Sequence, residues 1–274
     1  MTSGTAAPFA RLVLWFFLLP LPPLLRAEDP SFEVNPNRPT FATPALTTQP
    51  GVAELEGGLA HSAFKDGSKA FQTPTLIKLG LAKDFELRLG ANGFLRQTDP
   101  TGESVSGWSD GAIGVQWCYV HDGLFGMDQA VQILHKFPTA SVAKGLGSGR
   151  ADDVVMLLFR RDIGVHHLDV NVLETWLGQK PEDDGGHVRQ AAGTVSITHG
   201  FGEKWSVTGE LYALSSTPLN PRIVSNLWAL DYKVSPRMVL DCGVDFGLTR
   251  GAQRYSLVAG LTVGLARFPR PWAR

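Results

Sequence analysis

Hydrophobic and polar residues alternate strictly along positions 225–249. In the second half of this stretch one set of alternate positions is apolar and the other is polar or small: Met238, Leu240, Cys242, Val244, Phe246 and Leu248 against Val239, Asp241, Gly243, Asp245, Gly247 and Thr249. A repeat of two residues is typical of a β-strand with one apolar and one polar face. Positions 225–234 alternate in the same way, and Ser235, Pro236 and Arg237 between them predict a turn. The stretch therefore predicts a β-hairpin.

The same repeat predicts twelve strands along the chain, separated by loop or turn residues. They are expected at 52–62, 74–82, 85–97, 109–120, 127–137, 152–160, 166–177, 187–199, 204–215, 225–234, 238–249 and 254–266. The segments 63–73 and 98–108 between them are interpreted as a loose polar stretch and a loop. The centre of 152–160 is apolar at every position, so the pattern does not indicate which of its faces points inward.

The number of strands and the lengths of their connections favour a membrane barrel. The strand number is even, and long connections alternate with short ones with one exception. Bacterial outer-membrane barrels have an even strand number, short periplasmic turns and longer outer loops. The pattern therefore predicts an all-β fold, a single antiparallel transmembrane barrel of about 12 strands over 51–268. A secreted soluble β-sandwich or ligand-binding barrel is the alternative, in which a second layer covers the apolar faces.

The N-terminus predicts export. Arg11 precedes the apolar run 12–19, and Ala27 ends a plausible cleavage site, so residues 1–27 are interpreted as a cleavable signal peptide. Residues 28–50 are rich in Pro, Thr and Asn and are expected to be extended. No later apolar run is long enough to span a membrane as a helix. Residues 269–274 are expected to form a C-terminal tail.

Four motifs resemble a known family, and they occur in the same order over nearly all of the chain after residue 27. They are PNRPTFATPALTTQPGVAELEGG (36–58), SDGAIGVQWCYV (109–120), GSGRADDVVMLLFRRDI (147–163) and DCGVDFGLT (241–249). Together they resemble the outer-membrane "transporter" family associated with the meta-pathway of phenol degradation. The resemblance implies an outer-membrane barrel with a transport function and names no solute. The tail after Phe268 departs from the terminal aromatic residue with which such barrels end.

Composition adds little chemistry. The chain of 274 residues has 25 basic and 26 acidic residues, so nothing favours a nucleic acid as partner. Cys118 and Cys242 are predicted on opposite strand faces, so no disulfide is expected. The seven histidines show no metal-ligand spacing on one face. A lipid-degrading barrel enzyme would need a serine beside a histidine on the lipid face, and His199 has none at matching height. We therefore expect no catalytic site, metal or cofactor.

Charged residues on the polar strand faces are the candidate site. We expect them to line the lumen: Glu54, Glu56, Lys78, Glu86, Arg88, Arg96, Lys136, Asp169, Glu210, Asp231, Asp241 and Asp245. They would either filter solutes in a wet pore or form ion pairs that hold the barrel rigid. Residues 28–50 could fold inward as a plug, with Arg38 contacting these acids.

The resulting functional hypothesis is passive transport of small solutes, aromatic or hydrophobic ones among them, across the outer membrane. A structural or adhesive barrel with a blocked lumen is the alternative from another class. The expected partners are outer-membrane lipid, small solutes and the barrel-assembly machinery, with both termini in the periplasm. The sequence leaves the oligomeric state open.

Overall fold

The computed structural model describes residues 32–179, 186–218 and 220–268. The interpretations of residues 1–27 as a signal peptide and of 269–274 as a tail lie outside these residues. The chain divides into two units after Phe32, and the second, which begins at Glu33, holds every strand.

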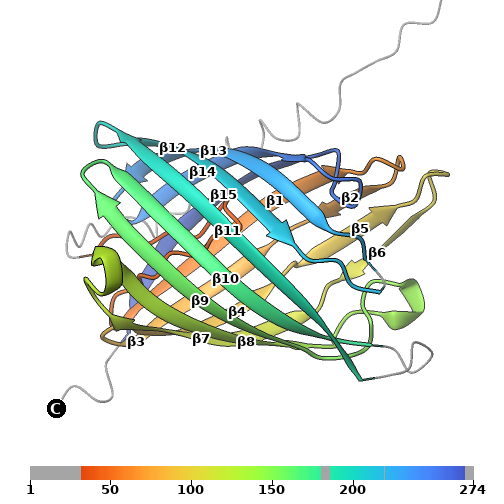
Figure 1. Ribbon diagram of the computed structural model, residues 1–274, viewed down its shortest axis with the longest axis horizontal. Helices are drawn as coiled ribbons and strands as arrows, with labels where there is room; N and C mark the ends of the chain where they lie inside the picture. Colours follow the sequence, from red (N-terminus) through yellow and green to blue (C-terminus); the bar gives the residue numbers. More distant parts are fainter. Residues whose placement is uncertain (1–31, 180–185, 219, 269–274) are drawn as a thin grey trace, which may run out of the picture. The chain divides into compact units, whose positions relative to one another are not determined.

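Twelve antiparallel strands close into a barrel, as the alternating pattern predicted (Figure 1). Each strand pairs with its neighbour in the chain, and pairing of β15 with β1 closes the ring. The barrel strands are β1 (Val52–Ala63), β3 (Thr75–Ala82), β4 (Phe85–Ala91), β7 (Gly111–Val120), β8 (Asp128–Phe137), β9 (Asp152–Ile163), β10 (His166–Gly178), β11 (His187–Phe201), β12 (Trp205–Leu214), β13 (Ile223–Ser235), β14 (Met238–Gly247) and β15 (Tyr255–Arg267).

Three further strands extend the wall beyond the ring, and they correct two of the loop predictions. β2 (Lys69–Gln72) lies in the segment expected to be loose, and β6 (Ser104–Trp108) lies in the expected loop. β5 (Phe94–Thr98) continues β4 after a short interruption. β2 pairs with the end of β1, β5 with β2, and β6 with β5. Small and polar residues dominate β6, so hydrophobic periodicity could not identify it.

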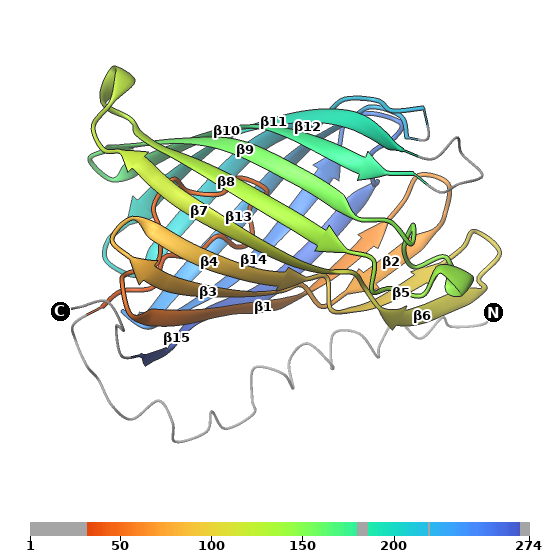
Figure 2. The same ribbon diagram turned by 90° about the horizontal axis from the view of Figure 1, so that it is seen from below.

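Short and long connections lie at opposite ends of the barrel (Figure 2). The end that carries 83–84, 121–127, 164–165, 202–204 and 236–237 is called the short-turn end. The opposite, long-loop end carries 64–68, 99–103, 138–151 and 248–254, and it is the end at which β10 is followed by β11 and β12 by β13. The 3-10 helices η2 (Leu124–Gly126) and η3 (Val142–Lys144) lie in the connections 121–127 and 138–151. Gly164 supplies the positive φ of 62° that a two-residue hairpin turn requires.

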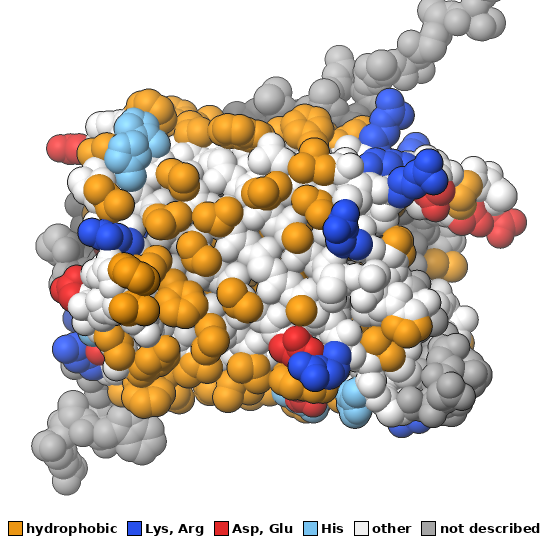
Figure 3. Space-filling view, viewed as in Figure 1, with side chains coloured by type: hydrophobic (Ala, Val, Ile, Leu, Met, Phe, Trp, Pro, Cys, Tyr) orange, Lys and Arg blue, Asp and Glu red, His pale blue; other side chains and the backbone are white. Residues whose placement is uncertain are grey.

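Apolar side chains point outward and polar side chains inward. On β10, Val172 is 54% exposed while its neighbour Asn171 is 1% exposed. Hydrophobic side chains spread over the outer surface of the strands in Figure 3. β9 alternates between the same two faces, because Leu157 is 44% exposed and Leu158 is fully buried, although both residues are apolar. This orients the strand that the pattern could not orient. Among the described residues, no helix is long and apolar enough to cross a membrane.

The barrel interior also contains a small apolar core. Ala45, from the N-terminal segment, packs with Cys118, Ala130 and Leu158 of neighbouring strands. Cys118 is therefore inside the barrel, whereas Cys242 is exposed on its outer surface, and both thiols are free. The interior is thus closely packed at this point and polar elsewhere.

Candidate functional site

Residues 33–49 cross the inside of the barrel. The amide of Thr48 donates to Glu86 of β4 at 2.6 Å, and the amide of Thr43 donates to Asn171 of β10 at 2.7 Å. β4 and β10 are far apart around the ring, so a segment that contacts inward side chains of both lies in the lumen. Figure 2 shows this segment as the irregular red trace between the strands.

Wall carboxylates bind the main chain of this segment. Glu56 accepts a hydrogen bond from the amide of Asn37 at 2.9 Å. Glu210 accepts from the amides of Phe41 at 2.8 Å and Ala42 at 2.6 Å. An irregular segment inside a barrel has no ladder partner, so its buried amides must find acceptors elsewhere. Ionised carboxylates are stronger acceptors than neutral groups, so these contacts fix the path of the segment.

Lys78 is the centre of the most deeply buried ion cluster. Its side chain is fully buried, and its Nζ lies 3.0 Å from Glu54 and 2.7 Å from Glu56. It also donates to the carbonyl oxygen of Asn35 in the segment. A buried charge is tolerated only when it is paired and its remaining donors are satisfied. The cluster therefore depends on both the barrel wall and the segment.

Arg38 makes a two-point contact with Asp241. Arg38 Nε and Nη2 each lie 3.2 Å from a carboxylate oxygen of Asp241 on β14. Gly58 and Gly260, which are opposite each other on β1 and β15, make room for the guanidinium. A Cβ on Gly58 would lie 2.3 Å from Arg38 Nη2, and one on Gly260 would lie 2.6 Å from Arg38 Nε. Both positions therefore need glycine while Arg38 occupies this place.

A second cluster joins β4 and β7 to the segment. Arg88 Nη1 donates to Glu86 at 2.6 Å and to Gln116 at 2.9 Å. The side-chain Nε2 of Gln116 in turn donates to the carbonyl oxygens of Pro44 at 2.9 Å and Leu46 at 3.0 Å. Gln116 thus connects Arg88 to the segment. It was not among the predicted residues, because only charged side chains were considered.

Three further ion pairs involve residues that sequence reasoning missed. Arg160 of β9 lies 3.1 Å from Asp169 of β10. Lys136 lies 2.7 Å from Asp110 and 3.0 Å from Asp152. Arg160 was missed because the apolar centre of β9 did not show which face of the strand points inward. The two aspartates were missed because they lie at strand boundaries. The available signal for the two aspartates was their proximity to Lys136, and for Arg160 it was the proximity of Asp169 on the next predicted strand.

Asp231 and Asp245 have weaker partners than the other acids. Ser206 donates to Asp231 at 3.3 Å, and Tyr212 donates to Asp245 at 2.5 Å. In each of them the other carboxylate oxygen, Oδ1, is buried and has no hydrogen-bond partner within the described ranges. Gln253 Nε2 also donates to Asp245, but neither acid forms an ion pair within the described ranges.

Arg96 departs from the expectation for the candidate set. It is exposed on β5 and contacts Ser104 at 3.4 Å. The neighbouring Leu95 lines an interior cavity, so Arg96 points to the other face of the strand. Asn92 and Gly93 interrupt the strand before this point and shift the alternation by one residue. Arg96 is thus not a lumen residue.

Two cavities lie on either side of the segment. The inner chamber, of about 360 Å³, includes the turn residues Gly202 and Lys204 of the short-turn end. The outer chamber, of about 610 Å³, includes Leu146 of the long-loop end. Arg38 and Thr40 line both chambers, so this part of the segment separates them.

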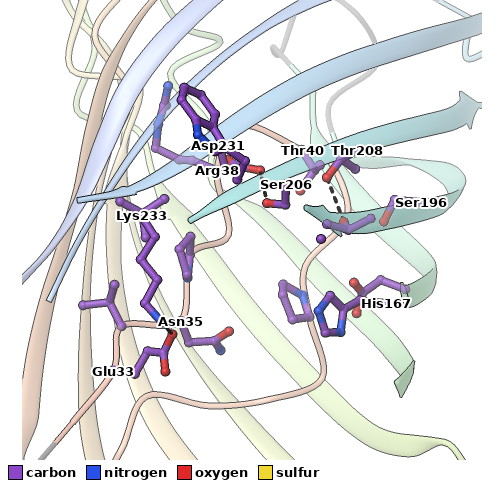
Figure 4. A pocket seen from close by; sticks show the side chains of 18 of the residues that line it. Glu33, Asn35, Arg38, Thr40, His167, Ser196, Ser206, Thr208, Asp231 and Lys233 are labelled. Atoms are coloured by element: carbon purple, nitrogen blue, oxygen red, sulfur yellow. Dashed lines mark hydrogen bonds and ion pairs between the residues drawn. The ribbon is translucent and has the colours of Figure 1, made fainter. Parts of the chain in front are cut away.

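The two chambers differ in chemistry. Polar and charged side chains surround the inner one, as Figure 4 shows for Asp231, Lys233, Ser206 and His167. The outer one is lined by six aliphatic side chains besides its charged groups: Leu76, Leu95, Leu134, Leu146, Val154 and Val258. Its bases Lys136 and Arg88 are each paired with an acid. The outer chamber therefore suits an apolar molecule better than an ion.

His121 connects two turns of the short-turn end. Its Nε2 lies 3.1 Å from Asp84, and its Nδ1 lies 3.1 Å from Asp128. The hydrogen bond to Asp84 raises the pKa of His121 above its usual value, and Asp128 adds to this effect. Protonated His121 therefore holds the turns 83–84 and 121–127 together. Among the described residues, no group of three or more ligand side chains could hold a metal ion.

Comparison with known proteins supports the fold. No protein-family model matches the chain, and no curated protein matches it. An outer-membrane channel from Pseudomonas putida F1 superimposes with a TM-score of 0.61 at 11% identity, covering 85% of this chain and 100% of that one. The CymD monoaromatic hydrocarbon channel gives a TM-score of 0.49 at 8% identity, covering 81% of this chain and 90% of that one. The KdgM porin gives 0.48 at 13% identity, covering 76% and 98%. The first of these likenesses, together with the closed ring of strands, gives the chain the fold of an outer-membrane barrel.

Proposed function

We propose that the protein is a passive channel of the outer membrane that carries small hydrophobic or aromatic solutes. The observation that carries this proposal is a closed barrel whose lumen holds an aliphatic chamber. The chamber volume of about 610 Å³ lies within the range of small-molecule sites, about 300–1,000 Å³. The proposal includes membership of the transporter family associated with the phenol meta-pathway. The four sequence motifs support this part.

Location in the outer membrane is supported by the outer surface. Exposed apolar residues such as Val172, Ile197 and Leu211 would be unfavourable in water over so many strands. Exposed aromatic residues near the strand ends, including Trp108 and Trp205, fit the interfacial belts of membrane barrels. The alternation of short and long connections supports both termini in the periplasm, where the assembly machinery and lipid are the partners.

The segment 33–49 acts as a plug in this proposal. It lies between the two chambers, so a solute that passes from one to the other must move past Arg38 and Thr40. The wall charges serve mainly to hold the plug and the wall: Glu54, Glu56, Lys78, Glu86, Arg88, Asp169, Glu210 and Asp241. Lys136 lines the outer chamber and Asp231 the inner one, so these two face space that a solute can use. The charges are thus both structural and lumen-lining.

Planar-bilayer recording tests the channel and its plug together. The unaltered protein is expected to show a small single-channel conductance, and deletion of residues 33–49 is expected to raise it several-fold. Gly80→Ala should displace the segment without removing it, because a Cβ there would lie 2.1 Å from the carbonyl oxygen of Gln49. It should therefore raise the conductance less than the deletion does. Gly90→Ala is the matched control, since its nearest neighbour would be 3.6 Å away. An unchanged conductance in the deletion variant would remove the plug from the proposal.

A barrel with a permanently blocked lumen is the second candidate. The many contacts that hold the segment inside the barrel favour it. A structural barrel predicts no current in any buffer and no solute uptake by cells that carry the protein. Solute uptake by such cells decides between the two.

A further inference from the structure

The barrel wall is not continuous at the long-loop end. Within the described residues, β6 pairs only with β5, so its other edge has no strand partner. β8 and β9, the next strands around the ring, end at this level, and the connection 138–151 stands beside the open edge. Lys144 donates to the carbonyl oxygen of Ser106 at 3.0 Å. The wall is thus completed here by a loop and not by a ladder.

Three neighbouring strands are interrupted at the same height. The interruptions are Thr73 and Pro74 between β2 and β3, 92–93 between β4 and β5, and 109–110 between β6 and β7. Thr73 donates to the carbonyl oxygens on both sides of Gly93, which itself has a φ of 61°. Pro74 has no amide to donate to a ladder. Single hydrogen bonds replace the ladder at these interruptions, such as that from the amide of Ser109 to the carbonyl oxygen of Gly93 at 2.8 Å. The sheet β2–β5–β6 therefore joins the barrel here without a continuous ladder, except through β1.

The outer chamber lies directly behind this line. Pro74, Asn92, Ser109 and Asp110 belong to the interruptions and line the chamber. Leu146 of the connection 138–151 lines it as well, and a Cβ on Gly107 of β6 would lie 2.7 Å from Leu146 Cδ1. Along β6 the seam is thus closed by Leu146 against Gly107 and by the hydrogen bond from Lys144 to Ser106. Next to β6, the amide of Ala140 in the connection donates to Asp110 at 2.8 Å.

Exposed aromatic residues place the seam at the membrane interface. Trp108, at the end of β6, is 72% exposed and makes an edge contact with Phe94 of β5. Phe137, at the end of β8, is 43% exposed. Aromatic residues of membrane barrels gather at the boundary between lipid and water, where small apolar molecules also accumulate.

We propose that the seam between β6 and the connection 138–151 is a side portal that leads small neutral apolar solutes from the outer membrane interface into the outer chamber. The proposal rests on the proposed channel function. A solute that enters this way passes from one apolar environment to another and avoids the polar mouth of the barrel. The line of interruptions lets the sheet β2–β5–β6 lean outward without breaking the closed ring below it.

A cross-link across the seam tests the portal. The variant Gly107→Cys/Leu146→Cys, made with Cys118→Ala and Cys242→Ala, is oxidised to lock the seam and reduced to release it. The probe is radiolabelled toluene, with initial uptake measured in Gram-negative cells that carry the protein, beside KCl conductance in planar bilayers. We expect loss of most toluene uptake on oxidation, recovery on reduction and an unchanged KCl conductance.

The matched control locks a continuous ladder. Leu230→Cys faces the native Cys242 across β13 and β14, so with Cys118→Ala it gives a cross-link where no portal exists. This cross-link should leave toluene uptake unchanged. Gly107→Val has the opposite effect to the seam lock, because its side chain would push Leu146 away, and it should increase uptake without any cysteine.

The outcomes separate the portal from the channel. If the locked seam and Gly107→Val both leave toluene uptake unchanged while KCl current persists, the portal is wrong and the channel function stands. If locking lowers KCl conductance in proportion to uptake, solute and ions share the axial route and the portal is again wrong. If the unaltered protein gives neither toluene uptake nor current, the channel function fails and the portal with it.

Discussion

Asp231 lies directly opposite Asp241 across the β13–β14 ladder, and only Asp241 has an arginine partner, Arg38. Like charges at directly opposed positions destabilise a sheet. Arg38 therefore does more than anchor the plug, because it also offsets repulsion between two strands of the wall.

Arg38→Gln should destabilise the plug and the wall together. Removing one partner of a buried ion pair typically costs about 3–5 kcal/mol, and this value is an upper range here because Arg38 keeps some exposure. We expect a lower midpoint in denaturant unfolding and a higher single-channel conductance. Adding Asp241→Asn should recover much of the stability, since it removes the unpaired charge. No recovery in the double variant would show that the two side chains act separately.

Lys78→Met should be among the most damaging single changes in the wall. It would leave Glu54 and Glu56 buried and close together without a cation, which costs about 3–5 kcal/mol. Lys83→Met is the control, because the Lys83 side chain is 85% exposed and its contact with Asp84 is long, at 4.0 Å. Unfolding in detergent micelles compares the two variants. Equal midpoints would mean that the buried cluster contributes nothing to stability.

The outer surface should show a dependence on depth. Val172, in the middle of β10, and Val165, in the turn 164–165, are 54% and 55% exposed. Arginine at the bilayer midplane costs about 2–4 kcal/mol in a membrane barrel and about 0–1 kcal/mol near the interface. Val172→Arg should therefore reduce folding into lipid vesicles, and Val165→Arg should fold normally. A soluble barrel would tolerate both equally.

His121 should stabilise the short-turn end in a pH-dependent manner. Its pKa is raised in the folded state, so its contribution is complete below the unfolded pKa, about 6.5, and is lost as the pH rises through the folded pKa. Unfolding midpoints of the unaltered protein and His121→Gln should differ at pH 5.5 and converge by about pH 9. If the difference between the two unfolding midpoints stays constant across this pH range, the hydrogen bonds of His121 stabilise the protein without its charge.

Sequence alternation predicted the barrel because each strand has one lipid face and one polar face. Leu240 and Asp241 illustrate this, since the first is on the lipid face of β14 and the second, its neighbour, is on the lumen face. The method failed where the environment was the same on both sides, as in β9 around Leu158, or where small residues carried no signal, as in β6. It also failed at Arg96, because a two-residue interruption changes the alternation without changing the composition.

The candidate charges were predictable as a set, but their partners were not. Parity places Lys78, Glu54 and Glu56 on inward faces, and the contact follows from their being neighbours on β1 and β3. The role of Glu210 could not be derived in this way, because its partners are main-chain amides of Phe41 and Ala42. A main-chain amide has no sequence signature, so the path of residues 33–49 becomes visible only in three dimensions.

Because wall side chains such as Glu56, Glu210 and Asn171 bind the backbone amides of residues 33–49, many side chains of that segment are not needed to anchor it. Mutational drift in it should be tolerated at positions such as Thr43, provided that the amide remains, while proline at the gripped positions should not be. The wall acids Glu56 and Glu210 have no comparable freedom. Laboratory evolution could thus reshape what the segment presents to a passing molecule without loosening its hold on the barrel.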